Sequence, residues 1–300
     1  MRAIGGRLYV PDADPPYNGF GVVDHGTEGY VFLSDATGHF APASMPHFRL
    51  PGRPGPETAG AAVLPRAYHV IDVIRFRGRL YASTGSVLPT ERAWHGASPG
   101  ALHVASADLA RWSYEVDYPF PWRDGVWRLG FMVRFRDALY AGIEDYDGRE
   151  PNDYVVFAPA AESTAIRRED AHPGRVTPNG AALTLRWYAD GARLYWITLE
   201  RGGTATLRVT SDGSTWTAID LPVDAGRPTD ITRFRDALVV LTYRLEDAGP
   251  TLRARVTERK TPFELSDAFC SAPIAVYRDA LYAGGQRDGA LYRLGEGAAP

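Results

Sequence analysis

The sequence predicts an all-β protein, a six-bladed β-propeller of four-stranded antiparallel blades whose last blade has three or four strands. One strand–turn–strand pattern recurs six times along the 300 residues, and 23 prolines and 31 glycines interrupt every sustained helical period. The repeats are 43 to 72 residues apart, which suits one four-stranded blade with loops of varying length. The leucine of the pattern stands at Leu8, Leu80, Leu139, Leu194, Leu238 and Leu281.

Each repeat consists of an apolar strand, a two-residue turn and a second strand. The clearest copies are Arg75–Ala82 and Arg134–Ala141, in which Arg-Gly or Arg-Asp forms the turn. A turn this short forces the two strands to pair antiparallel. The repeated residues therefore specify the fold and carry no chemistry.

The repeats divide a predicted single domain, 1–300, into approximate blades. We expect these at 1–44, 69–117, 130–166, 183–221, 229–266 and 272–295. Closing the ring would remove the exposed strand edges that such blades otherwise present. The last repeat shows no clear fourth strand, so either it has three strands or the N-terminal residues complete it.

A second hairpin in two of the repeats carries a common turn motif. Ser106-Ala107-Asp108 precedes Trp112, and Thr210-Ser211-Asp212 precedes Trp216, so both turns match Ser/Thr-x-Asp-x-x-x-Trp. This motif resembles the Asp-box (BNR) repeat of sialidase-like β-propellers, in a form one residue shorter. The resemblance implies a propeller in which the carboxylate caps backbone N–H groups above a packed tryptophan. It implies no activity, because the sialidase arginine triad, nucleophile pair and acid cannot be placed on this sequence by motif.

Composition excludes several classes of function. The net charge of −3 argues against a nucleic-acid partner, since binding phosphates needs clustered positive charge. Lys260 and Cys270 are the only residues of their types, which argues against lysine Schiff-base chemistry, disulfides and thiolate metal clusters. The sequence shows no apolar leader and no membrane span, so we expect no membrane contact. We also expect the protein to be a monomer. It would be cytoplasmic as written, or secreted if a leader has been removed.

The functional site is expected on the face of the propeller that carries its long loops. Tight turns lie on one face, and the connections between second and third strands and between blades lie on the other. The long connections are 11–29, 44–68, 84–99, 117–130, 143–153 and 163–182. Long loops gathered on one side of a rigid scaffold are where binding and catalytic groups usually sit.

These loops carry aromatic and charged residues suited to ligand binding. The ligand-binding candidates are His25, Trp94, His95, Trp122, Trp127, Arg128 and Tyr146. Aromatic planes beside carboxylates and arginines suit sugar rings and other polar ligands. In the competing interpretation, the aromatic side chains only pin the loops to the scaffold.

The catalytic candidates are acids and one histidine near the same face. They are Asp72, His69, Glu144, Asp145 and Asp230, with His95 as an alternative acid or base. A hydrolase or lyase would need two carboxyl groups facing each other across the pocket, one with a raised pKa. The alternative for the candidates on the first strands is hydrogen bonding between adjacent strands.

No cofactor or metal is predicted with any strength. Asp145-x-Asp147-Gly148, flanked by Glu144 and Glu150, offers oxygen ligands to Ca²⁺, but the extended EF-hand pattern is missing.

Three functions stay open. The first is binding of a small polar or glycan ligand, with hydrolase or lyase activity; the second is a non-catalytic protein-interaction scaffold; the third is a cofactor-free enzyme whose Trp94, Trp122 and Trp127 enclose a hydrophobic metabolite.

Overall fold

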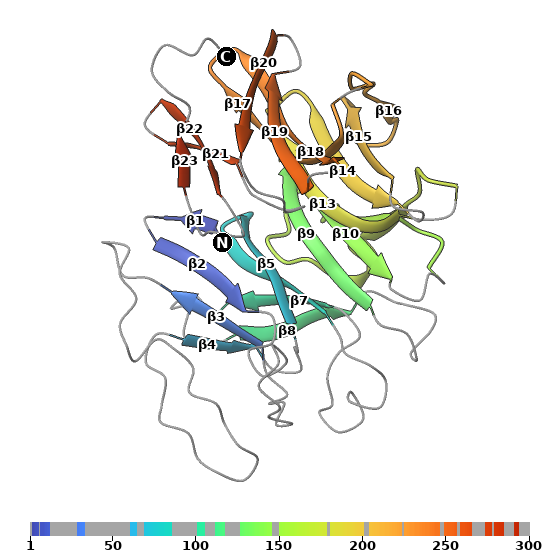
Figure 1. Ribbon diagram of the computed structural model, residues 1–300. Helices are drawn as coiled ribbons and strands as arrows, with labels where there is room; N and C mark the ends of the chain where they lie inside the picture. Colours follow the sequence, from blue (N-terminus) through green and yellow to red (C-terminus); the bar gives the residue numbers. More distant parts are fainter. Residues whose placement is uncertain are drawn as a thin grey trace, which may run out of the picture. The chain divides into compact units, whose positions relative to one another are not determined.

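The computed structural model confirms an all-β protein built of antiparallel sheets (Figure 1). Its one described helical element is a 3-10 turn, η3 (Arg168–Asp170). No helix in the described part of the chain is long and apolar enough to cross a membrane. The structure describes residues 2–5, 7–12, 29–33, 61–64, 69–85, 101–105, 112–117, 127–145, 150–178, 181–200, 204–223, 225–246, 249–256, 259–265, 274–277, 279–284 and 291–293.

The chain forms two compact units, residues 1–182 and 183–300. Unit 1 begins with a sheet of β1 (Arg2–Ile4), β2 (Arg7–Asp12), β3 (Gly29–Leu33) and β4 (Ala61–Leu64). It continues with β5 (His69–Phe76), β6 (Arg79–Gly85), β7 (Ala101–Ala105) and β8 (Trp112–Asp117). It ends with β9 (Trp127–Phe135), β10 (Ala138–Asp145), β11 (Tyr154–Phe157) and β12 (Ala171–Gly174). The last two groups of strands join into one sheet through pairing of β6 with β9.

Unit 2 also contains three groups of antiparallel strands, and here each group is a separate sheet. Its first sheet contains β13 (Ala181–Ala189), which starts at the boundary, then β14 (Leu194–Glu200), β15 (Ala205–Thr210) and β16 (Thr217–Ala218). The next contains β17 (Arg227–Phe234), β18 (Ala237–Glu246), β19 (Gly249–Val256) and β20 (Arg259–Leu265). The last has three described strands, β21 (Ile274–Tyr277), β22 (Ala280–Gly284) and β23 (Leu291–Arg293).

Six hairpins begin these groups of strands, and four of them turn on a non-glycine residue with positive φ. These residues are Arg77, Arg136, Arg235 and Asp279, with φ between 45° and 58°. Two-residue turns of this kind match the twist of the paired strands, although side chains disfavour positive φ. In three of them the guanidinium lies 5.0 to 5.5 Å from the ring of the preceding phenylalanine, a cation–π contact that offsets part of the strain.

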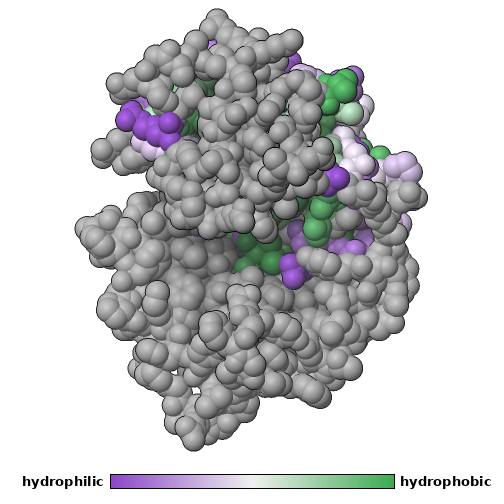
Figure 2. Space-filling view, viewed as in Figure 1, coloured by the Kyte–Doolittle hydropathy of each residue, from purple (hydrophilic) through white to green (hydrophobic). Residues whose placement is uncertain are grey.

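Large apolar side chains of the described residues are buried almost throughout. In unit 1 they form one cluster around Met132, Leu139 and Phe157, and another around Tyr9 and Val73. The exposed exceptions are Val223 and Val276. On the side shown in Figure 2, described hydrophobic and hydrophilic residues are interspersed.

A tryptophan cluster and a capped turn stabilise the first sheet of unit 2. Trp187 and Trp196 stack with ring centroids 4.7 Å apart, and Trp216 packs at 5.4 Å from Trp196. In the turn before Trp216, Asp212 Oδ1 accepts the backbone N–H groups of Ser214 and Thr215 at 2.8 and 2.7 Å. These bonds lower the pKa of Asp212 below its ordinary value. The carboxylate therefore fixes the turn that carries the tryptophan.

Two connections lie elsewhere than the sequence indicated. The segments 44–68 and 163–182 were expected as long loops between blades, but they contain β4 and β12, the fourth strands of their groups. The residues between Phe157 and Ala171 therefore join the third and fourth strands, at the end of the sheet where the tight hairpin turns lie. Because β12 reads Ala-His-Pro-Gly and is largely exposed, it lacks the apolar alternation that predicts a strand.

Candidate functional site

Four predicted site residues meet at one end of the third group of strands in unit 1. Glu144 on β10 pairs with Arg128 on β9, and Arg128 also pairs with Gly85 on β6; Asp145 pairs with Trp127. Three neighbouring strands thus begin or end at this place. The segments 86–100, 118–126 and 146–149, which hold most of the predicted aromatic ligand contacts, all leave the sheet from here.

Two glycines make room for the charged pair at this end. Arg128 Nη1 lies 4.0 Å from Glu144 Oε2, with the Glu144 side chain 7% exposed and that of Arg128 27% exposed. A Cβ at Gly85 would lie 2.5 Å from Arg128 Cγ, and one at Gly130 would lie 2.7 Å from Glu144 Oε1. The missing Cβ atoms of the two glycines therefore leave the space that the arginine and glutamate side chains occupy.

A second pair of acids follows directly along the chain. The N–H of Glu150 donates to Asp145 Oδ2 at 2.5 Å, and Asn152 donates to Glu150 Oε1 through its N–H at 3.1 Å and its Nδ2 at 2.5 Å. Both acids are buried. Burial raises the pKa of Glu150, the nearby charge of Asp145 adds to the rise, and the Asn152 bonds oppose it. The site thus holds a carboxyl group that retains its proton to higher pH, which is the property of a general acid.

The suggested calcium ligands are only partly described. Glu144, Asp145 and Glu150 lie at this end of the sheet, whereas Asp147 and Gly148 lie outside the described residues. Among the described residues, no group of three acids, histidines or cysteines is placed to hold a metal ion.

Asp72 lies in a different environment, between three first strands. Its carboxylate accepts Arg2 Nε at 2.9 Å on Oδ1, Arg2 Nη2 at 2.6 Å on Oδ2, and the N–H of Met132 at 2.9 Å on Oδ2. The N–H of Val73 also donates to Oδ1 at 2.9 Å. We call Arg2, Asp72 and Met132 the first clasp, because the three residues join β1, β5 and β9.

Asp230 makes the corresponding contacts in unit 2. Its Oδ1 lies 2.8 Å from Arg186 Nε and accepts the N–H of Ile231 at 2.7 Å, and its Oδ2 accepts the N–H of Ile274 at 2.8 Å. Burial raises the pKa of Asp230, while the charge of Arg186 and the two amide bonds act in the opposite direction. Arg186, Asp230 and Ile274 form the second clasp, which joins β13, β17 and β21.

The clasps are hydrogen bonds between adjacent first strands, the alternative role that the sequence left open for these aspartates. A catalytic role for Asp72 or Asp230 stays a prediction. His69 and Trp127 are placed by their backbone alone, on β5 and β9. His25, Trp94, His95, Trp122 and Tyr146 lie outside the described residues, so their assignments also stay predictions.

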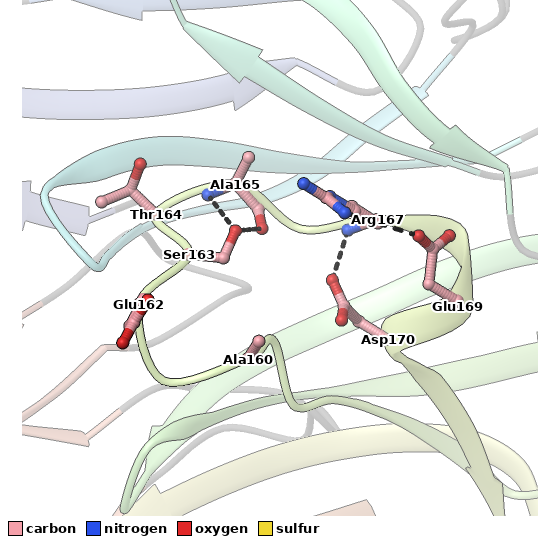
Figure 3. A pocket seen from close by; sticks show the side chains of 8 residues that line it. All are labelled: Ala160, Glu162, Ser163, Thr164, Ala165, Arg167, Glu169 and Asp170. Atoms are coloured by element: carbon pink, nitrogen blue, oxygen red, sulfur yellow. Dashed lines mark hydrogen bonds and ion pairs between the residues drawn. The ribbon is translucent and has the colours of Figure 1, made fainter.

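A pocket of about 590 Å³ lies at the opposite end of the same strands (Figure 3). It is formed within the connection between β11 and β12. Its lining residues are Ala160, Glu162, Ser163, Thr164, Ala165, Arg167, Glu169 and Asp170. Arg77 Nη1 donates to the carbonyls of Ala160 and Ser163 at 2.7 and 2.8 Å, which fixes the connection to the first hairpin of the preceding group.

Sequence reasoning named Glu150 only as a flanking calcium ligand, and it missed the two glycines and the residues of this pocket. The glycines had a usable signal, because Gly85 and Gly130 interrupt strands where glycine often marks the close approach of another group. The pocket had none, since β12 does not have the sequence pattern of a strand and so does not show where the connection ends.

Comparison with known proteins gives structural likeness without a family. No protein-family model and no curated protein sequence matches the chain. A chain of the nidogen–laminin complex aligns with a TM-score of 0.44 and 10% identity over 90% of this chain and 87% of that one. A chain of the BBS1N–ARL6DN complex aligns at 0.40 and 14% over 91% and 89%. The α-L-arabinofuranosidase of Lactobacillus brevis aligns at 0.37 and 7% over 87% and 84%.

The polysaccharide lyase Uly1 aligns at 0.38 and 11% identity over 74% of this chain and 56% of its own. At these TM-scores and identities, the likeness assigns neither a family nor an activity.

Proposed function

We propose that the chain is a six-bladed β-propeller that binds a small polar or glycan ligand where β6, β9 and β10 meet. The observation that carries the proposal is the line of paired residues Gly85, Arg128 and Glu144. It sets an arginine and a buried acid at the point from which three segments that carry predicted aromatic ligand contacts leave the sheet. The six sequence repeats support the closed ring. The bonds that Asp212 accepts in the turn before Trp216 are those that the Asp-box resemblance implies.

The chemistry of the described groups suits hydroxyl-bearing ligands. The guanidinium of Arg128 supplies fixed donors, while the carboxylates of Glu144 and Asp145 supply acceptors. Glu150 adds a carboxyl group with a raised pKa. A glycoside hydrolase or a lyase uses two carboxyl groups, one with a raised pKa to protonate the leaving group and one to act as base or nucleophile.

A thermal-shift screen of neutral and acidic oligosaccharides and small polar metabolites tests the site. A ligand present at about 100 times its Kd stabilises the folded protein by about 2.7 kcal/mol, enough for a clear shift. We expect Glu144→Gln and Arg128→Gln to lose the shift that a hit gives to the wild type, each measured against its own ligand-free melting temperature.

Glu162→Gln is the matched control, because Glu162 is an exposed acid at the opposite end of the same strands. It should keep the full shift. Equal shifts in Glu144→Gln, Arg128→Gln and the control would place the ligand elsewhere. A panel without a single hit would remove the support for a glycan-binding role.

A further inference from the structure

The two clasps share three contacts. In each, an arginine Nε lies within 2.9 Å of Oδ1 of the aspartate, the next residue's N–H donates to the same Oδ1, and an N–H of a third strand donates to Oδ2. In the first clasp, Arg2 Nη2 also donates to Asp72 Oδ2 and to the carbonyl of Met132. In each, a β-bulge directly precedes the aspartate, between Val70 and Asp72 or between Pro228 and Asp230. The same irregular backbone thus turns the same carboxylate toward its partners.

The two clasps also occupy matching places in the repeat. Each aspartate stands eight residues before the leucine of its repeat, and Met132 and Ile274 each stand seven residues before theirs. Arg2 and Arg186 stand six and eight residues before theirs. A difference of two residues keeps a side chain on the same face of a strand, so both arginines can reach the carboxylate.

Only the second and fifth repeats have aspartate at this place. The third, fourth and sixth have Phe131, Arg186 and Pro273 there. The clasp therefore recurs with a period of three hairpins, taking its arginine from the first, its carboxylate from the second and its N–H from the third. The boundary between the two compact units, at residues 182 and 183, falls between the two sets of three.

We propose that the six hairpins are organised as two triplets, each locked by its own clasp into one cooperative unit that unfolds separately from the other. Within a triplet, the clasp is a polar link that reaches all three first strands at once. Each carboxylate is almost fully buried, so it depends on its partners for all of its solvation. This inference is independent of the proposed ligand site.

Hydrogen exchange of the full chain in increasing urea, followed by mass spectrometry, tests the triplets. We expect Asp72→Asn to speed exchange in β6, β9 and β10 by about tenfold or more, and to leave β14 and β18 unchanged. Asp230→Asn should do the converse. The matched controls are Glu162→Gln in unit 1 and Asp220→Asn in unit 2, because both acids are exposed.

Arg2→Gln and Arg186→Gln provide a milder pair should either asparagine variant fail to fold. Each removes a partly exposed arginine and leaves the amide bonds of the aspartate in place. We expect Arg2→Gln to speed exchange in unit 1 alone and Arg186→Gln to speed exchange in unit 2 alone. Faster exchange in both units from either single change would show one cooperative unit and overturn the proposal, as would exchange no faster than in the controls.

Discussion

Glu150 is the residue at which burial most clearly alters the chemistry of the candidate site. Its pKa is raised above 4.5 in the folded chain, so the fold favours its protonated form. The stability that it contributes is therefore present below about pH 4.5 and is lost as the pH rises through the raised pKa. We expect Glu150→Gln, which cannot ionise, to gain stability relative to the wild type between pH 4 and 8 as the pH increases.

Urea unfolding of both proteins across this range measures the difference in free energy. Glu162→Gln should show a difference that does not change with pH, because Glu162 is exposed. If the difference in unfolding free energy between Glu150→Gln and the wild type stays constant or falls with rising pH, the fold does not disfavour the ionised form of Glu150.

The two glycines beneath the charged pair should differ in their tolerance of a methyl group. At Gly85 the added Cβ meets Cγ, Cδ and Cβ of Arg128, the part of the side chain nearest the backbone. At Gly130 the closest atom is a terminal oxygen of Glu144, which can rotate away. We expect Gly85→Ala to cost about 1–3 kcal/mol of unfolding free energy and Gly130→Ala less. Equal costs, measured by urea unfolding, would show that Arg128 yields as easily as Glu144.

Among the elements, the hairpin turn at Arg77 serves two structures at once. Asparagine suits its positive φ better than arginine does, so Arg77→Asn should improve the turn itself. The change also removes the bonds that Arg77 donates to the carbonyls of Ala160 and Ser163. We expect faster hydrogen exchange and proteolysis within 158–170. Arg235→Asn makes the same change at a matching turn and should leave that segment unaffected.

The turn before Trp216 is a second element whose stability depends on one side chain. Asp212 accepts two N–H groups, and these bonds lower its pKa below 3.8. A group of this kind stabilises the fold above its unfolded pKa and ceases to do so as the pH falls through its folded value. We expect Asp212→Ala to melt below the wild type at pH 7, and the gap to narrow below about pH 3.8. Asp220→Ala, an exposed change in the same unit, should show no gap at either pH.

The sequence predicted the elements better than it predicted the site. Hairpins such as Arg75–Ala82 are visible because alternation and turn type are local properties of the chain. The strand β12 was missed, because pairing with β11 holds an Ala-His-Pro-Gly segment extended against its own preference. Asp72 and Asp230 were singled out as acids, but their partners Arg2 and Arg186 are 70 and 44 residues away along the chain. Only the fold brings such residues together.

At the scale of the whole molecule, the six repeats predict closure into one ring, which a measurement of size can test. A compact chain of 300 residues has a radius of gyration of about 19 Å. Two triplets closed into one propeller should match this value in small-angle X-ray scattering, with a single maximum in the distance distribution. Asp72→Asn and Asp230→Asn should match it too wherever they stay folded, because each clasp acts within its own triplet. A radius well above that value for the wild type, with a second maximum at long distance, would mean two triplets that do not close, and the ligand site would then have to be complete within residues 1–182.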